Sequence, residues 1–244
     1  MKKIEASKVR IVSSGFPAAC YVYGIIDFAQ RIILKSKAIG FFGKIYSIPY
    51  KDIGALVSRT SYSEYDPSEE NLMTHNEALF EAYREYRVAV LPLRFSTVAK
   101  SETDVLKILS AGYSKFKIKM ASLSGKLEFA VKVYCNIEGL KIEITQEKNA
   151  NGNAQPEEEV KQRSLVIANN LLQRLKSVAV DHQLNELIFE DAIMNAAFLV
   201  EERSLRKFTQ EIAGCEKRVG RNFRIKTSGP YVPYSFTEPP KTES

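Results

Sequence analysis

The hydrophobic period of this 244-residue chain changes abruptly at Ser124-Gly125, and this change limits the folds that the chain can adopt. Before it, apolar residues recur every three or four positions, the spacing of one helix face: Leu106, Leu109, Tyr113, Phe116, Met120 and Leu123. After it, apolar residues alternate as in a strand with one buried face: Leu127, Phe129, Val131, Val133 and Cys135. Glu128, Lys132 and Tyr134 take the solvated face. The chain is therefore predicted to be α+β with two domains that meet near residues 124–126.

The first domain is predicted to span residues 18–124 in the order β-β-β-α-β-α. Its strands are expected at Cys20–Asp27, Lys44–Tyr50, Ile53–Arg59 and Val88–Leu93, the last a central strand because it is almost wholly apolar. Ser68 is expected to cap a helix that places Leu72, Leu79, Phe80 and Tyr83 on one side. Ser101 and Asp104 resemble a capping box at the start of the second helix.

The second domain is predicted to span residues 125–236 in the order β-α-β-β-α-β, which is that of a modified ferredoxin-like fold. A helix is expected from Pro156, with Val160, Ile167, Leu171, Leu175 and Val178 buried. Two strands are expected at Glu186–Asp191 and Ala192–Glu201. A helix with Leu205, Phe208, Ile212, Cys215 and Val219 on its apolar face and a strand with Phe223 and Ile225 follow.

Four segments are predicted to lie outside this regular structure. Residues 1–17 are expected to form a mobile arm, Asn149–Pro156 a flexible loop and residues 237–244 a disordered tail. Residues 228–244 are rich in proline and are expected to be extended.

Cysteine and hydropathy patterns favour a cytoplasmic protein. Cys20, Cys135 and Cys215 are odd in number and far apart, which is typical of reduced, buried thiols and not of zinc ligands. Charged residues interrupt the N-terminal segment where a signal peptide would be apolar, and no apolar run reaches the length of a membrane span.

The titratable residues do not form a recognisable catalytic group. His75 and His182 are the only histidines. His75 shares a helix face with Leu72 and Leu79, so a hydrogen-bonded packing role is favoured, and His182 is expected in an exposed loop. Asp27, Asp52, Glu190 and Asp191 could supply paired carboxylates, but each falls at a strand end or turn, where Asp and Glu commonly bond the backbone. We predict no catalytic residue, no metal and no cofactor.

Two segments combine apolar anchors with residues that restrict the backbone: Leu91–Val98 and Ser228–Phe236. They are the candidate docking or shape-fixing motifs, with Pro92, Arg94, Phe95, Gly229, Pro230, Pro233, Tyr234 and Phe236 as their candidate residues. Arg94 could pair with a carboxylate, cap carbonyl groups or contact a partner, and pairing is favoured. The second segment could fold back or dock another chain, and folding back is favoured.

These segments also carry a resemblance, which spans roughly residues 20 to 236. The chain resembles the gas vesicle protein GvpF/GvpL family in the order Tyr21–Ile25, Ile53–Ser58, His75, Leu91–Phe95 and a Gly-Pro-x-x-Pro-Tyr-Ser-Phe tail at Gly229–Phe236. Ser96 departs from the family, which usually has glycine there. If that position requires a positive φ, Ser96 is strained by about 1 kcal/mol.

The resemblance implies a non-enzymatic accessory or minor structural protein of the gas vesicle. It implies that the partners are the very apolar shell protein GvpA and other gas vesicle accessory proteins, with no nucleic acid, membrane or small-molecule substrate. The implied task is to prevent GvpA from aggregating and to assist nucleation and assembly of the vesicle wall.

Two alternatives stay open. Residues 1–126 hold 19 Lys and Arg against 12 Asp and Glu, so a nucleic-acid-binding module with a ferredoxin-like sheet is conceivable. The predicted sheet lacks paired stacking aromatics, which counts against it. A small-molecule enzyme with an interdomain site is the third hypothesis, and the absence of a recognisable nucleophile weakens it.

Overall fold

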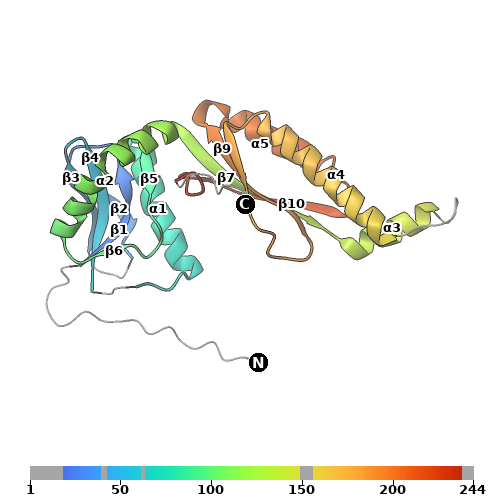
Figure 1. The fold of residues 1–244 in the computed structure, drawn as a ribbon, viewed down its shortest axis with the longest axis horizontal. Helices are drawn as coiled ribbons and strands as arrows, with labels where there is room; N and C mark the ends of the chain where they lie inside the picture. Colours follow the sequence, from blue (N-terminus) through green and yellow to red (C-terminus); the bar gives the residue numbers. More distant parts are fainter. Residues whose placement is uncertain (1–18, 40–42, 62–63, 149–155, 238–244) are drawn as a thin grey trace, which may run out of the picture. The chain divides into compact units, whose positions relative to one another are not determined.

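The computed structural model describes residues 19–39, 43–61, 64–148 and 156–237. Backbone packing divides them into two compact units, one reaching Gly125 and including Tyr231–Thr237, the other running from Lys126 to Pro230 (Figure 1). This division differs from the predicted domains at residues 231–236, which the sequence placed in the second domain. The predicted arm at 1–17, and residues 149–155 and 238–244 of the predicted loop and tail, lie outside the described residues.

The first unit contains an antiparallel sheet between helices α1 and α2 (Figure 1). The strands are β1 (Ala19–Ile26), β2 (Ile33–Lys37), β3 (Lys44–Tyr50), β4 (Ile53–Thr60), β5 (Val90–Pro92) and β6 (Val98–Ala99), in the order β2-β3-β4-β1. Strands β5 and β6 pair with opposite ends of β1. Helices α1 (Glu69–Tyr86) and α2 (Glu102–Leu123) both contact β1, which is buried along nearly all its length.

Both helix starts agree with the sequence. Ser68 caps α1 and accepts a hydrogen bond from the Asn71 N–H at 3.3 Å. Ser101 caps α2, accepting from the Asp104 N–H at 3.2 Å and donating to its carboxylate at 2.9 Å. The side-chain oxygen in each case satisfies a helix N–H that has no partner within the helix.

The first sheet differs from the prediction in two details. Strand β2 was missed because it lies at the sheet edge and its apolar residues end at Leu34, with Ile33 54% exposed. The apolar run Val88–Leu93 does not form a central strand. Only Val90–Pro92 pairs, at the margin of β1, and both helices cover it.

The buried helix faces agree with the predicted ones only in part: Leu79 of α1 and Leu109, Met120 and Leu123 of α2 are buried as expected. In α1 the buried side chains are Thr74, His75, Ala78, Leu79 and Ala82, while Leu72 is exposed. In α2 they are Val105, Leu109, Met120 and Leu123, while Leu106 is exposed. Alanine and threonine carried little weight in the predicted stripes, yet small side chains let a helix lie close to a sheet.

The second unit confirms the predicted fold class. Its strands are β7 (Lys126–Cys135), β8 (Asp181–Leu184), β9 (Ala192–Glu201) and β10 (Phe223–Tyr231), in the order β10-β7-β9-β8. This is the 4-1-3-2 strand order of a ferredoxin-like sheet. Helices α4 (Pro156–Lys176) and α5 (Leu205–Glu216) pack on one face, and a 3-10 turn (Glu202–Ser204) precedes α5.

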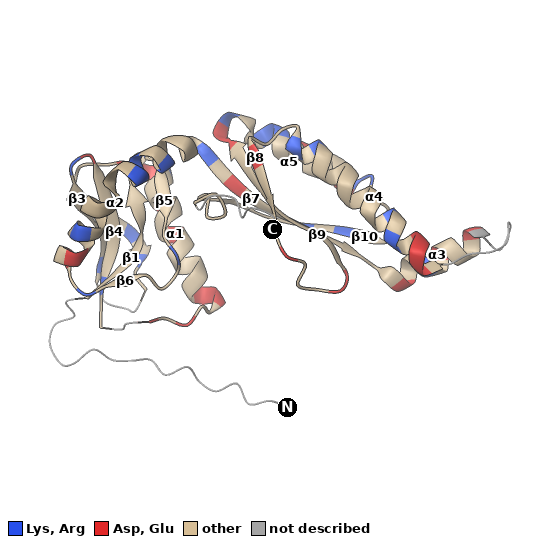
Figure 2. Ribbon diagram, viewed as in Figure 1, with Lys and Arg blue, Asp and Glu red and all other residues tan. Residues whose placement is uncertain are grey.

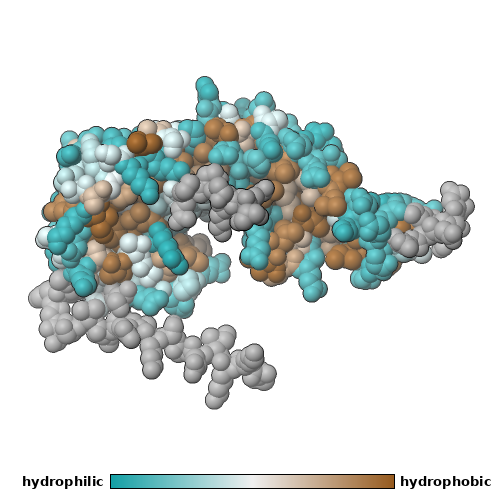
Figure 3. Space-filling view, viewed as in Figure 1, coloured by the Kyte–Doolittle hydropathy of each residue, from teal (hydrophilic) through white to brown (hydrophobic). Residues whose placement is uncertain are grey.

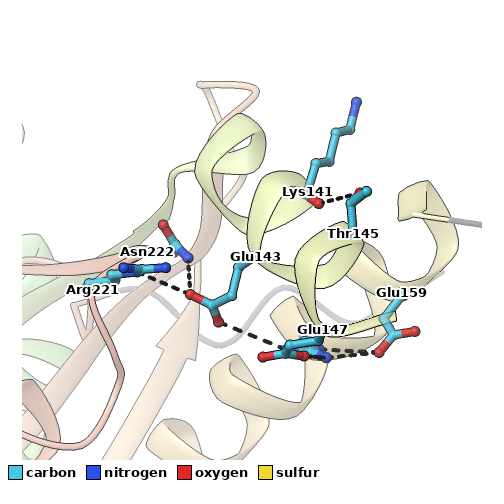
Figure 4. Close-up of polar contacts among 8 residues, drawn as sticks. Lys141, Glu143, Thr145, Glu147, Glu159, Arg221 and Asn222 are labelled. Carbon is cyan, nitrogen blue, oxygen red and sulfur yellow. Dashed lines mark hydrogen bonds and ion pairs between the residues drawn. The ribbon is translucent and has the colours of Figure 1, made fainter. Parts of the chain in front are cut away.

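An additional helix, α3 (Ile137–Lys148), modifies that fold and was not predicted. Glu143 of α3 accepts hydrogen bonds from Asn222 Nδ2 at 2.8 Å and Arg221 Nε at 3.2 Å (Figure 4). Arg163 of α4 reaches Glu147 of α3 at 2.7 Å. Leu140 and Ile144 of α3 are buried against Cys135 and Val160, and these long-range polar contacts add to that apolar packing.

The prediction of a strand at Glu186–Asp191 was wrong. Strand β8 ends at Leu184, where its pairing with Ala196 of β9 stops, and residues 184–191 form an exposed connection. His182 therefore lies in a strand, with its ring 6.3 Å from that of Phe198. Glu128, expected on a solvated face, is buried to 7% exposure.

Candidate functional site

The two motifs that the sequence singled out meet in the first unit. Phe95 from one and Tyr234 from the other lie beside His75 of α1, with ring centroids 5.8 and 5.9 Å from the imidazole. Tyr21 and Tyr23 of β1 lie 5.6 and 5.4 Å from it. We call these five residues the aromatic centre.

Hydrogen bonds connect Tyr21 of the aromatic centre to His75 and to the backbone of Ser96. The Ser96 N–H donates to the Tyr21 hydroxyl oxygen at 3.2 Å. The Tyr21 hydroxyl lies 2.7 Å from His75 Nδ1, so the simplest arrangement has Tyr21 donating to Nδ1 and the imidazole carrying its proton on Nε2. Nε2 makes no hydrogen bond of ordinary geometry within the described residues. His75 therefore has the hydrogen-bonded packing geometry that the sequence favoured.

Burial keeps these groups neutral at physiological pH. It lowers the pKa of His75 to about 4, against a smaller opposing effect of the Leu93 backbone. Burial also raises the pKa of Tyr23 to about 12 and that of Tyr21 further still. Since none of these pKa values lies near 7, the centre is poorly suited to proton transfer.

The Leu91–Val98 motif forms a break in the sheet margin. Between β5 and β6 the chain loops out, and the Thr97 N–H closes the turn on the Arg94 carbonyl at 3.2 Å. Ser96 has a φ of +65°. This is the left-handed conformation that we considered because the family usually has glycine at this position. Its hydroxyl accepts from the Tyr65 N–H at 2.8 Å.

The C-terminal motif folds back, as favoured, but into the first unit. Val232, Pro233 and Phe236 are buried, and Val232 belongs to the core that contains Tyr21 and Leu79. Among the described residues of the segment predicted to be extended, 228–237, the strand β10 ends at Tyr231. Beyond it the Tyr234 N–H donates to the Val232 carbonyl at 2.9 Å and the chain turns.

Gly229 and Pro230 belong to β10. Gly229 has a φ of +118°, and a Cβ at this position would lie 2.7 Å from the Glu128 carbonyl oxygen of β7. Glycine is therefore required both by the conformation and by the close approach of the two backbones. Pro230 follows in the same strand and is half-buried.

Pro92 and Arg94 differ in exposure. Pro92 is buried at the end of β5, whereas Arg94 is exposed. The favoured pairing of Arg94 is not seen: its guanidinium makes no ion pair or hydrogen bond within the described residues. Arg94 is thus the one cation of the motif that is available to a partner.

The candidate carboxylates separate into two places. Asp27 and Asp52 both bind Lys117 Nζ, at 2.7 and 2.9 Å, and Tyr113 donates to Asp52 at 2.7 Å. Hydrogen bonds from Lys117 and then Tyr113 lower the pKa of Asp52 to about 2. An aspartate held charged in this way ties α2 to the sheet and is a poor general base. Glu190 and Asp191 lie in the second unit.

No metal or membrane signature is found in the part of the chain that the structure describes. There, no three His, Cys, Asp or Glu side chains gather as metal ligands would, and no helix is long and apolar enough to cross a bilayer. The three cysteines are buried and form no disulfide.

One exposed surface was missed by the sequence reasoning. Leu184, Leu187, Ile188 and Phe189 are large, apolar and exposed in the β8–β9 connection. The sequence predicted Leu187, Ile188 and Phe189 to lie in a strand at Glu186–Asp191 and indicated no role for Leu184. The lack of alternation in Leu187–Phe189 and the acidic residues on either side could have indicated a loop.

Comparison with known proteins identifies the family. Residues 19–238 match the model of the gas vesicle synthesis protein GvpL/GvpF family. The chain is 22% identical over 219 residues to gas vesicle protein F1 of Halobacterium salinarum, covering 89% of this chain and 92% of the relative. It is 26% identical over 214 residues to gas vesicle protein F of a Nostoc species, covering 80% and 88%.

Solved structures share the fold. The crystal structure of GvpF from Anabaena sp. PCC7120 superposes with a TM-score of 0.77 at 22% identity, covering 93% of this chain and 98% of that one. GvpF from Microcystis aeruginosa gives 0.72 at 23% identity, covering 91% and 99%. Because the family model matches nearly the whole chain, this protein belongs to the GvpL/GvpF family of gas vesicle proteins.

Proposed function

We propose that this protein binds the gas vesicle shell protein GvpA in the cytoplasm and keeps it from aggregating while the vesicle wall nucleates and grows. Family membership supports a role in gas vesicle formation. A very apolar subunit needs a transient cover, because exposed apolar surface drives association in water. The protein acts on its partner by binding and makes or breaks no covalent bond.

The aromatic centre is the observation that carries this proposal. Tyr21, Tyr23 and His75 are at most 2% exposed, and the centre joins a sheet strand, a helix and both sequence motifs. A closed, neutral cluster of this kind holds a surface in one shape and offers no access to a substrate. It supports docking over catalysis.

Of the eight motif residues, we propose that Arg94 contacts the partner. It is exposed, whereas Pro92, Phe95, Pro230, Pro233, Tyr234 and Phe236 are buried or half-buried, and Gly229 has no side chain. The five that share the first unit with Arg94, namely Pro92, Phe95, Pro233, Tyr234 and Phe236, then set the shape of that unit, while Gly229 and Pro230 shape β10 of the second.

Co-expression with GvpA tests the proposed function. We expect more GvpA to stay in the supernatant after ultracentrifugation with this protein than with an unrelated α+β protein at equal level. Tyr21→Phe, which removes the hydroxyl and keeps the ring, should retain this effect if shape matters and chemistry does not. Equal sedimentation of GvpA with both proteins would refute the proposal.

The charge-reversed variant Arg94→Glu tests the contact residue. Recovery of GvpA with Arg94→Glu should fall relative to Lys100→Glu, a matched reversal at a nearby exposed lysine. If the two variants recover GvpA equally, Arg94 is not a contact.

A further inference from the structure

The connection between β8 and β9 concentrates exposed apolar side chains to an unusual degree. Residues 184–191 are all exposed, and four of them are large and apolar: Leu184 at 62%, Leu187 at 48%, Ile188 at 75% and Phe189 at 56%. We call residues 184–191 the apolar loop. It begins with Leu184, the last residue of the edge strand β8, and apolar surface is visible in that part of the second unit (Figure 3). Contiguous apolar patches on a monomer commonly mark an interaction site.

Hydrogen bonds to the neighbouring strand hold the apolar loop in place. The Asn185 N–H donates to the Asn195 carbonyl at 2.7 Å, and Asn195 Nδ2 donates to the Glu186 carbonyl at 2.9 Å. The Ala192 N–H donates to the Phe189 carbonyl at 3.1 Å. With its ends fixed in this way, the loop loses less conformational entropy on binding than a free segment would.

The apolar loop and the residues that flank it in the sequence carry charge of one sign, although Asp191 lines a pocket together with Arg221 and Arg224. Residues 177–202 contain no Lys or Arg, and their acidic residues are Asp181, Glu186, Glu190, Asp191, Glu201 and Glu202. The loop accordingly shows acidic positions and no basic ones (Figure 2). A partner that fits this surface combines apolar side chains with Lys or Arg at its rim.

A second copy of this chain does not fit. Two apolar loops in contact would bring Glu186, Glu190 and Asp191 of both copies together, and like charges oppose such pairing. Four partly exposed side chains also offer only a few hundred Å², against roughly 800 Å² per partner in a stable interface. The surface suits a transient contact with a different, apolar partner.

We propose that the apolar loop, with the free edge of β8 beside it, is the docking surface for the apolar, basic-rimmed face of a shell subunit. This rests on the proposed function, from which the partner is taken to be GvpA. The loop supplies apolar contact, and its acidic flanks orient the partner.

Binding of GvpA fused to a solubility tag tests this surface. The variant L187S/I188S/F189S should weaken binding by about tenfold or more, as loss of central apolar anchors does. The control L72S/M73S alters two apolar side chains of α1 that are 45% and 56% exposed, and should change affinity by less than about twofold. Unchanged circular dichroism and melting temperature show that both variants are folded.

The charged flanks give a second measurement. E186K/E190K should weaken binding at low salt and reduce the loss of affinity that salt causes in the wild type. A wild-type affinity independent of salt, or unaffected by E186K/E190K, would contradict the role of the acidic flanks.

The outcomes separate the two proposals. If wild-type protein binds GvpA and L187S/I188S/F189S binds equally well, the loop is not the docking surface, while the proposed function stands. If wild-type protein fails to bind GvpA, both proposals fall. A wild-type dimer that L187S/I188S/F189S converts to monomers would show a self-interface and overturn the assignment.

Discussion

At Ser96 two opposing contributions to stability act on one residue. Its φ of +65° costs about 1 kcal/mol relative to glycine. Its hydroxyl accepts the Tyr65 N–H at 2.8 Å, which is worth about 1 kcal/mol. Ser96→Ala keeps the strain and loses the bond, so the free energy of unfolding should fall by about 1–2 kcal/mol. Ser96→Gly loses both and should leave stability nearly unchanged.

Urea denaturation of both variants distinguishes these contributions. The informative quantity is the difference in free energy of unfolding between the two variants, and we expect Ser96→Gly to be more stable than Ser96→Ala. Equal stability of Ala and Gly at position 96 would mean that the surrounding turn relaxes and stores no strain.

His75 should make stability depend on pH in a defined window. Its pKa is 6.5 in the unfolded chain and about 4 in the folded protein, because burial disfavours the charged imidazole. The unfolded chain therefore takes up a proton first as the pH falls. The contribution of the neutral His75 to the free energy of unfolding is therefore fully present above pH 6.5. It decreases by about 3 kcal/mol as the pH falls to 4.

Denaturation between pH 7 and 4 should show a shallower slope for His75→Asn than for the wild type. His182→Asn is the control, because His182 is only half-buried and its pKa is lowered less clearly by burial. If His182→Asn flattens the profile and His75→Asn does not, the buried imidazole is not the titrating group.

At the scale of elements, the sequence predicted a helix start or a strand correctly where the residues of that segment alone determine its structure. The caps at Ser68 and Ser101 and the alternation after Leu127 could be read directly from the sequence. That alternation also identified the buried face of β7, whose alternate residues from Leu127 to Cys135 are buried.

Elements that depend on distant partners could not be predicted. Strand β2 exists because β3 offers an edge, and β8 ends where β9 stops pairing with it. The aromatic centre joins residues 54 positions apart through the Tyr21–His75 contact. The motifs at Phe95 and Tyr234 were recognised separately, but no local pattern shows that they meet.

Helix α3 buries Leu140 and Ile144, and Glu143 adds polar contacts that help to hold it in position. Glu143 is mostly buried and accepts from Asn222 and Arg221 near the start of β10. Glu143→Ala leaves these donors without their partner and should lower stability by about 1–2 kcal/mol. Hydrogen exchange should show faster exchange of α3 amides, since the helix opens locally before the sheet does.

Glu138→Ala provides the matched control on the same helix. Glu138 is 80% exposed and, within the described residues, pairs with Lys141 on its own helix, so its loss should have little effect. Equal acceleration of α3 exchange in both variants would show that the Glu143 contacts do not hold the helix.

At the scale of the whole molecule, the first unit depends on residues from the end of the chain. The first unit is complete only when residues 231–237 have returned to it after the entire second unit. Its core includes Val232, which is fully buried with Tyr21 and Leu79. A C-terminal side chain therefore stabilises an N-terminal sheet.

Val232→Ala tests this dependence because it removes two methyl groups from that core. The free energy of unfolding of the first unit should fall by about 2 kcal/mol. Native-state hydrogen exchange should show the loss in β1 and β4 amides, with β7 and β9 unchanged. Val180→Ala, the same change at a 52% exposed site in the second unit, should affect neither. Loss of protection in β7 and β9 with β1 unaffected would instead mean that the C-terminal segment stabilises the second unit.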